Sequence, residues 1–287
     1  MTWLLAASLL WAFSFGLIKG HLTDLDPWAV AAVRLGLAVL LFAPWIIRRA
    51  PAAPLRHRAL LLGAIQFGAM YAFYISSYQY LAAWQVALWT VFTPLYVVLL
   101  DEGRQRRLQL SSLAAALLAM AGAMLVHGRW PSGDTLVGIL LVQGSNLCFA
   151  VGQLGYRPLS RAVIGPGQGA RSREAGLLGW MYVGAAVLAL VGFAIFGDRT
   201  RLAFDGDAVV VLLYLGFLPT AAGFWLWNTG AARTSATLLA VANNLKVPLA
   251  VLVSWLVFQE SAPYLRALAG LIMMVAALII AAPRRQA

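Results

Sequence analysis

The stretch Asn243-Asn244-Leu245-Lys246-Val247-Pro248 places two amides, a lysine and a proline near the middle of a long apolar run, residues 234–258. A cation at the centre of a membrane helix costs about 2.5–3.5 kcal/mol on insertion scales, and such residues mark solute or ion pathways. Proline removes a helical hydrogen bond and frees backbone groups. The stretch therefore predicts a polar site at depth, if the rest of the chain is a membrane protein.

The composition indicates an integral membrane protein. Of the 287 residues, 62% are hydrophobic and 11% are charged, whereas soluble domains carry about 25% charged residues. The net charge of +11 does not predict a nucleic-acid partner, because the basic residues lie in short loops rather than on one face. The single cysteine, Cys148, excludes an intramolecular disulfide. Residues 3–18 follow no basic segment, so we interpret them as an uncleaved first helix rather than a signal peptide.

Ten apolar runs approach or exceed the length of about 20 residues that a membrane helix needs. They fall at about 3–19, 28–47, 59–80, 84–100, 110–127, 135–154, 174–196, 208–230, 234–258 and 263–282. The loops between them are short and rich in proline and glycine. We therefore predict an all-α integral membrane protein with ten transmembrane helices in the lipid bilayer.

The basic residues predict the orientation of these helices. Of the 21 lysines and arginines, 14 lie in loops or termini on one side and five on the other, while Arg34 and Lys246 lie inside spans. Cytoplasmic loops carry an excess of such residues. Both termini are therefore predicted to be cytoplasmic, in a multi-pass membrane protein.

The two halves of the chain resemble each other weakly. Three pairs of stretches match at offsets of 138, 153 and 154 residues. They are Trp11-Ala12 with Phe149-Ala150, Leu62-Gly63 with Leu215-Gly216, and Thr93-Pro94-Leu95 with Val247-Pro248-Leu249. An odd number of helices per unit inverts the second copy, which is typical of secondary transporters with a site near the midplane. We predict two inverted five-helix repeats, residues 1–130 and 131–287.

Pro94 and Pro248 occupy equivalent depths in this repeat and are the predicted helix breaks, or hinges. The simpler interpretation is that membrane helices tolerate proline without any functional reason. The matched offset favours the transporter.

Several motifs resemble those of the EamA-type drug/metabolite transporter superfamily over the whole chain. They are residues 10–16 (LWAFSFG), residues 33–38 (VRLGLA), and the prolines of the predicted fourth and ninth helices. Five further stretches are similar to the biotin transporters of that superfamily: residues 63–71, 90–96, 140–150, 227–231 and 243–248. The resemblance implies a secondary transporter for the uptake of biotin by alternating access. An exporter of amino acids or related small metabolites is the alternative.

Polar and aromatic residues inside the spans are the candidate substrate-binding residues. They are Lys246, Asn243, Asn244, Asn228, Trp227, Gln143, Asn146, Gln66, Tyr71, Gln85, Trp89 and Phe92. Amides in membrane helices often only join helices together, and aromatic stripes are more often core than ligand wall. We assign Lys246 to a carboxylate, the amides to the ureido group or to helix packing, and the aromatic residues to apolar rings.

Arg34 is the other cation inside a span. It matches the superfamily's second helix, and we expect it to snorkel or to bond backbone carbonyls rather than to bind solute.

The ten acids and three histidines all lie in loops or at helix ends. No carboxylate or imidazole is therefore placed to relay protons at depth, to pair with a nucleophile, or to hold a metal. No P-loop motif is present either. We expect a transporter that does not hydrolyse ATP, not an enzyme, without cofactor, metal or obligatory protein partner. Its partner is a small-molecule substrate.

Overall fold

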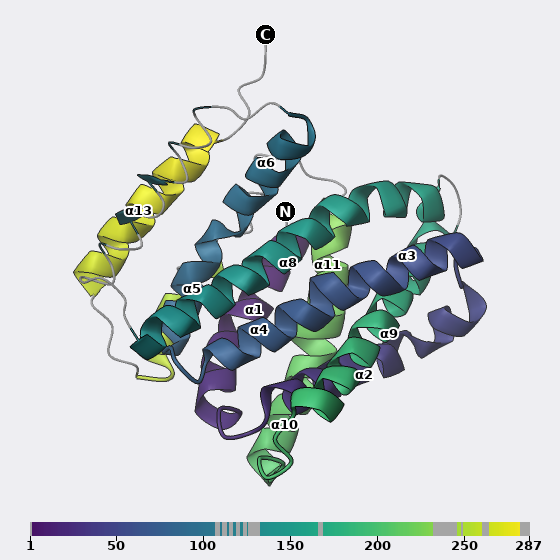
Figure 1. The fold of residues 1–287 in the computed structure, drawn as a ribbon, viewed down its shortest axis with the longest axis horizontal. Coiled ribbons are helices and arrows are strands. Elements are labelled where there is room, and N and C mark those ends of the chain that lie inside the picture. Colours follow the sequence, from purple (N-terminus) through teal and green to yellow (C-terminus); the bar gives the residue numbers. More distant parts are fainter. Residues whose placement is uncertain are drawn as a thin grey trace.

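The computed structural model describes residues 2–106, 133–165, 169–231, 246–247, 249–259 and 264–281, with seven further residues between 110 and 125. All its regular elements in these ranges are helices (Figure 1). In the first half they are α1 (Thr2–His21), α2 (Pro27–Arg48), α3 (Ala53–Gly63), η1 (Ala64–Ala69), α4 (Met70–Ser77), α5 (Ala83–Trp89), η2 (Thr90–Phe92) and α6 (Thr93–Arg104). In the second half they are α8 (Gly133–Ile164), α9 (Ala170–Phe196), α10 (Gly206–Leu215), η3 (Gly216–Ala222), α11 (Gly223–Ala231) and α13 (Tyr264–Ala281).

Seven helical segments of the described chain are long and apolar enough to cross a membrane. They are Thr2–His21, Pro27–Arg48, Ala53–Ser77, Ala83–Arg104, Gly133–Ile164, Ala170–Phe196 and Gly206–Trp227. These segments correspond to the predicted spans one to four and six to eight, and the chain is a multi-span membrane protein.

The predicted helix at residues 110–127 lies largely outside the described residues, and the one at residues 234–258 lies about half outside them. Within the latter, residues 246–247 and 249–256 are helical. Helix α13 occupies the range of the tenth predicted helix. The total of ten therefore stays a prediction.

The outer surface of the helices is apolar, as a lipid-facing surface must be. Large side chains such as Leu40, Leu61, Leu140 and Val210 are each more than 60% exposed. Because soluble proteins rarely expose apolar surface on this scale, this arrangement fits a bilayer as solvent.

The described part of the structure has three irregular spans, of which the sequence predicted a break only in the fourth, at Pro94. A π-helical segment, η1, joins α3 to α4, and a second, η3, joins α10 to α11. A 3₁₀ turn, η2, separates α5 from α6. Hydrophobic periodicity cannot show such changes, because all three helix types keep apolar residues on one face over a single turn.

Helix α8 is also longer than predicted. The predicted end near residue 154 marked the end of the apolar run, whereas the helix continues to Ile164. Its backbone hydrogen bonds do not require a lipid environment, so polar residues extend the helix beyond the apolar segment.

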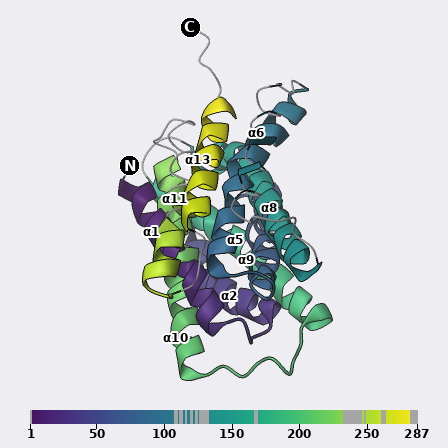
Figure 2. The ribbon, with the colours of Figure 1, turned by 90° about the vertical axis from the view of Figure 1, so that its left-hand side faces the viewer.

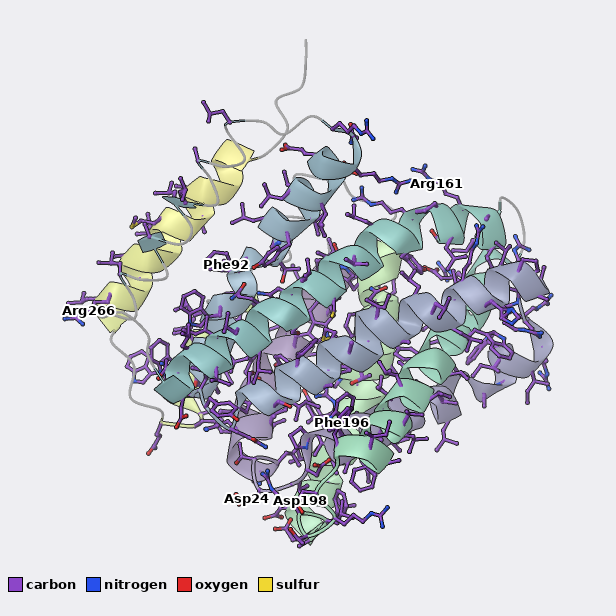
Figure 3. The ribbon with its side chains drawn as sticks, in the orientation of Figure 1. Asp24, Phe92, Arg161, Phe196, Asp198 and Arg266 are labelled. Carbon is purple, nitrogen blue, oxygen red and sulfur yellow. The ribbon has the colours of Figure 1, made fainter. Side chains whose placement is uncertain are left out.

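Two connections on one side of the protein, the α1–α2 loop and the α9–α10 connection, are hydrogen-bonded to each other. Asp26 caps α2 by accepting a bond from Ala29 N at 2.8 Å, and its second carboxylate oxygen accepts from Asp198 N at 2.9 Å. Arg201 Nε donates to Asp24 O at 3.0 Å. These bonds tie the α1–α2 loop to the α9–α10 connection, which runs along the lower end in Figure 2. Figure 3 shows Asp24 and Asp198 together at this end, with Arg161 at the opposite end.

Glycines bring the central helices into backbone contact. A Cβ on Gly63 would lie 1.9 Å from Met181 O, so α3 and α9 meet where no side chain fits. A Cβ on Gly216 would lie 2.6 Å from Leu37 Cδ1, where η3 meets α2. Small residues at helix crossings allow such close approach in membranes.

We predict that Gly63→Ala destabilises the protein by about 1–3 kcal/mol, because overpacking forces backbones apart. Gly36→Ala is the matched control, since a Cβ there meets nothing within 4 Å. Thermal unfolding of both variants in detergent measures the effect. Equal melting temperatures would contradict the close approach of α3 and α9.

Candidate functional site

A cavity lies at the centre of the described helices, between α1, α2, α4, α8, α11, the η2–α6 break and Lys246. Its volume is about 80 Å³, enough for several water molecules at roughly 10–15 Å³ each. The apolar part of its lining comprises Trp11, Phe15, Met70, Phe149 and Phe224. The polar part comprises Ser14, Arg34, Tyr71, Tyr74, Thr90, Thr93, Ser145, Asn146 and Lys246.

This lining contains two cations and no carboxylate. Arg34 is 1% exposed and Lys246 is 9% exposed. Attraction between opposite charges strengthens as the local dielectric constant falls. Because both cations are buried, the cavity is chemically suited to an anion. Among the described residues, no group of three or more His, Cys, Asp or Glu side chains is placed to hold a metal ion.

Lys246 lies against aromatic faces. Its Nζ is 5.4 Å from the ring centroid of Trp11 and 5.9 Å from that of Phe149, within cation–π range. Trp11 is itself fixed, because its Nε1 donates to Pro219 O at 2.9 Å. The lysine is thus held in an aromatic corner formed by α1 and α8.

The π-helical segment η3 supplies backbone groups to this region. Within Gly216–Ala222, side chains of other helices donate to two carbonyls of the irregular turn. Trp11 bonds Pro219 O, and Tyr182 Oη donates to Thr220 O at 2.7 Å. Backbone groups of an irregular turn at membrane depth need hydrogen bonds from the protein or from cavity water. Here side chains of α1 and α9 donate these bonds.

Arg34 occupies the wall of the cavity, which corrects the expectation of a snorkelling or carbonyl-bonded residue. Its Nη2 donates to Thr220 Oγ1 at 3.0 Å and to Tyr71 Oη at 3.2 Å. Its guanidinium carbon lies 4.3 Å from the Tyr71 ring centroid. Nη1 is buried and has no hydrogen-bond partner among the described residues. Arg34 therefore joins α2, α4 and η3 through side-chain hydroxyls.

The break in the fourth span is held by a second polar cluster. Pro94 has no N–H to offer Thr90 O, and Thr93 Oγ1 donates to that carbonyl at 2.9 Å. Asn146 Nδ2 donates to Trp89 O at 2.9 Å, and its Oδ1 lies 2.9 Å from Thr93 Oγ1, whose single proton is shared between this oxygen and the Thr90 carbonyl. Asn146 Nδ2 also donates to Gln143 Oε1 at 3.2 Å. Both donors of Asn146 are thus engaged, one with the break and one with Gln143 within α8.

Of the predicted substrate-binding residues, the structure brings Lys246, Asn146 and Tyr71 together around the cavity. Asn243, Asn244 and Pro248 lie outside the described residues, as does the side chain of Asn228 in α11.

The other predicted candidates lie behind the lining. Gln85 Oε1 accepts from Ala82 N at 2.9 Å and so caps α5. Trp89 and Phe92 stack on each other with centroids 5.7 Å apart. The Trp227 ring packs 5.3 Å from that of Trp11.

Two glutamines have similar supporting positions. Gln66 is 3% exposed and packs where α8 has a glycine, since a Cβ on Gly152 would lie 2.3 Å from it. Gln143 Oε1 accepts from Tyr96 Oη at 3.2 Å. Both glutamines stand outside the lining of the cavity.

The sequence reasoning did not propose most of the small polar and α1 lining residues as binding residues. Trp11, Ser14 and Phe15 come from α1, and Thr90 and Thr93 flank the helix break. One signal was available for Thr93: a threonine directly before a helix-breaking proline can bond the carbonyl that the proline leaves free.

Comparison with known proteins places the chain in a family. The model of the "EamA-like transporter family" matches residues 1–128 and again residues 136–282. The chain belongs to the EamA-like transporter family.

Several known proteins resemble it over nearly their full length. A "Probable biotin transporter" of Pseudomonas aeruginosa is 37% identical, covering 97% of this chain and 96% of that protein. The "Biotin transporter" of Salmonella typhimurium is 32% identical, and that of Escherichia coli K12 is 31% identical, each over 97% of this chain and 91% of the relative. A protein of known crystal structure shares the fold with a TM-score of 0.67, at 18% identity over 98% of this chain and 95% of that one.

We predict that Asn146→Leu lowers stability by about 1–3 kcal/mol, because it leaves the Trp89 carbonyl buried without its donor. Gln153→Leu, at a half-buried amide of the same helix outside the cavity lining, is the control. Melting temperatures in detergent would distinguish them. A Gln153 variant that loses as much stability as the Asn146 variant would refute the specific role of Asn146.

Proposed function

We propose that this protein is a secondary transporter that takes up biotin, or a similar small carboxylate, across the bacterial inner membrane by alternating access. The central observation is a cavity whose described lining residues combine two cations and aromatic faces, with no carboxylate among them. The relatives named as biotin transporters, at 31–37% identity over most of the chain, support the choice of solute.

The carboxylate, the fused rings and the ureido group of biotin each match a kind of residue in the proposed site. Its carboxylate is a monoanion, which is costly to bury unless it meets a cation. Its fused rings are compact and apolar, and its ureido group offers one acceptor and two donors. Lys246, beside Trp11 and Phe149, is the proposed counter-ion of the carboxylate.

Asn146 has a narrower role than direct recognition of the ureido group. Its two amide donors are engaged by Trp89 O and Gln143 Oε1, so it keeps only acceptor capacity for a solute. We therefore propose that Asn146 positions the cavity wall. Asn228, Asn243 and Asn244 remain the proposed amide partners of the ureido group.

An amino acid or related metabolite as exported solute is less well supported. Its ammonium group would need a carboxylate or a cage of carbonyls. The described lining provides two cations instead. The relatives are named as transporters, and we propose that the protein catalyses no reaction.

The fold supports two inverted repeats, residues 1–130 and 131–287. The two π-helical segments start at Ala64 and Gly216, in predicted spans three and eight. Predicted spans three and seven meet at Gly63, and predicted spans eight and two meet at Gly216. If five helices form one unit, span eight is the second copy of span three, and span seven is the second copy of span two. The two contacts are then equivalent. The two segments matched by the family model, 1–128 and 136–282, divide the chain in the same place.

The small volume of the cavity implies movement during transport. Small-molecule sites typically enclose about 300–1,000 Å³, whereas this cavity has about 80 Å³. Helices must therefore separate to admit a solute. Pro94 and Pro248 are the proposed hinges, and the breaks at η1, η2 and η3 are further points where spans can bend.

Orientation follows from the charge distribution, with both termini proposed to be cytoplasmic. Arg161 lies at the end of the molecule opposite Asp24 and Asp198 (Figure 3). Arginine-rich loops favour the cytoplasmic side.

The test of this function is uptake of radiolabelled biotin into proteoliposomes that contain this chain alone. We expect uptake that saturates and that unlabelled biotin inhibits. Uptake no faster than in protein-free liposomes would overturn the proposal.

We further predict that Lys246→Met weakens the apparent affinity for biotin by about tenfold or more, because a hydrogen bond to a charged group contributes roughly 1.5–3 kcal/mol. Lys246→Arg should retain part of it. Lys19→Met is the matched control: this lysine donates to Tyr78 O at 2.7 Å, and it does not line the cavity. A Lys246→Met protein with unchanged affinity would remove Lys246 from the site.

A further inference from the structure

The hydrogen bonds around Arg34 determine the direction of two hydroxyl protons. Thr220 Oγ1 receives two donors from Arg34, Nε at 3.3 Å and Nη2 at 3.0 Å. A hydroxyl oxygen has two acceptor lone pairs and one proton. Both acceptor positions of Thr220 are thus filled, and its only remaining capacity is to donate.

The proton of Thr220 therefore goes to Tyr71. The two hydroxyl oxygens are 3.0 Å apart, and either could be the donor by geometry alone. Because Thr220 can only donate, Tyr71 Oη must accept this bond. Tyr71 Oη also accepts from Arg34 Nη2 at 3.2 Å. Its acceptor capacity is filled in turn, which leaves its own O–H to donate elsewhere.

Three donors then remain without an acceptor in this corner. Arg34 has five N–H groups, and its bonds from Nε and Nη2 use three of them. Nη1 keeps two N–H groups, buried and without a partner among the described residues. The Tyr71 O–H is the third donor. Both residues line the cavity, and no acceptor side chain of the described structure answers them.

A buried charged donor without a hydrogen-bond acceptor costs free energy, and buried polar groups in proteins rarely lack a hydrogen-bond partner. A ligand that brings an acceptor oxygen would remove this cost. A cationic or donor group would raise it. The corner therefore selects for acceptors.

We propose that Arg34 Nη1 and the Tyr71 O–H form a donor-only subsite that binds an acceptor oxygen of the transported solute. Thr220 is the positioning residue, because its hydroxyl directs the Tyr71 proton and holds Nε and Nη2 away from the solute. The subsite rests on the proposed function and extends it: Lys246 provides one contact with the solute and the Arg34–Tyr71 pair provides a second. In biotin, the oxygen comes from the ureido carbonyl or from the carboxylate.

The test is equilibrium binding of radiolabelled biotin to the purified full chain, with two analogues as competitors. In 2-iminobiotin an imino nitrogen replaces the ureido oxygen, and in biotinol an alcohol replaces the carboxylate. Tyr71→Phe removes the proposed donor, together with the oxygen that accepts from Arg34 and Thr220, and keeps the ring. Arg34→Lys keeps the charge but loses the guanidinium fork.

We expect each variant to bind biotin about tenfold more weakly than wild type. The same substitution should have a much smaller effect on the affinity for the one analogue in which the bound oxygen is replaced by a different or weaker acceptor. An effect that disappears with 2-iminobiotin assigns the subsite to the ureido carbonyl, and one that disappears with biotinol assigns it to the carboxylate.

Tyr182→Phe is the matched control, because Tyr182 Oη bonds the backbone of the same residue, Thr220 O, and does not line the cavity. Melting temperatures show whether each variant is folded, and Arg34→Lys serves if Tyr71→Phe is not. Equal loss for biotin and both analogues, biotin affinity within about twofold of wild type, or the same pattern in Tyr182→Phe would overturn the subsite. Wild-type protein that does not bind biotin would overturn the proposed function together with it.

Discussion

The burial of Arg34 is the constraint on which the centre of this protein depends. An arginine that is 1% exposed cannot reach bulk water or lipid headgroups, so its bonds must come from the protein, from water in the cavity or from a ligand. Thr220 and Tyr71 supply part of them, from η3 and α4. The arginine thus fixes the relation of three spans at the level of the cavity.

The irregular helices follow from the same requirement. A straight α-helix keeps its carbonyls for itself, whereas η3 turns the Pro219 and Thr220 carbonyls towards Trp11 and Tyr182. At the break in the fourth span, the carbonyls of Trp89 and Thr90 are answered by Asn146 and Thr93. At both η3 and the break in the fourth span, the departure from α-helix is matched by a side chain from another element or by a hydroxyl nearby. Side chains thereby hold the cavity walls in place while the backbone keeps points at which it can bend.

Much of the fold could be predicted from the sequence, because the thickness of the membrane sets the minimum length of each apolar run that crosses it. The seven described spans lie where apolar runs predicted helices. The π-helical segments and the extension of α8 could not be predicted, since both depend on local backbone geometry and tertiary contacts rather than on hydrophobic periodicity.

The candidate site was predicted less completely. Lys246, Asn146 and Tyr71 line the cavity, and a polar residue in an apolar run is a sound signal for such positions. The same signal selected Gln66, Gln85 and Gln143, which support helix packing or capping instead. A sequence shows that a buried amide needs partners and does not show whether those partners are protein or solute. The expectation for Arg34 was wrong for this reason, because only the structure shows that Nη1 has no hydrogen-bond partner among the described residues.

The most direct test of an anion-selective cavity is a comparison of biotin with its methyl ester in equilibrium binding to the wild-type protein. The ester keeps the rings and the ureido group and loses only the negative charge. If the buried cations recognise the carboxylate, the free acid should bind at least about tenfold more tightly. Equal affinity for acid and ester would contradict a site organised around these cations.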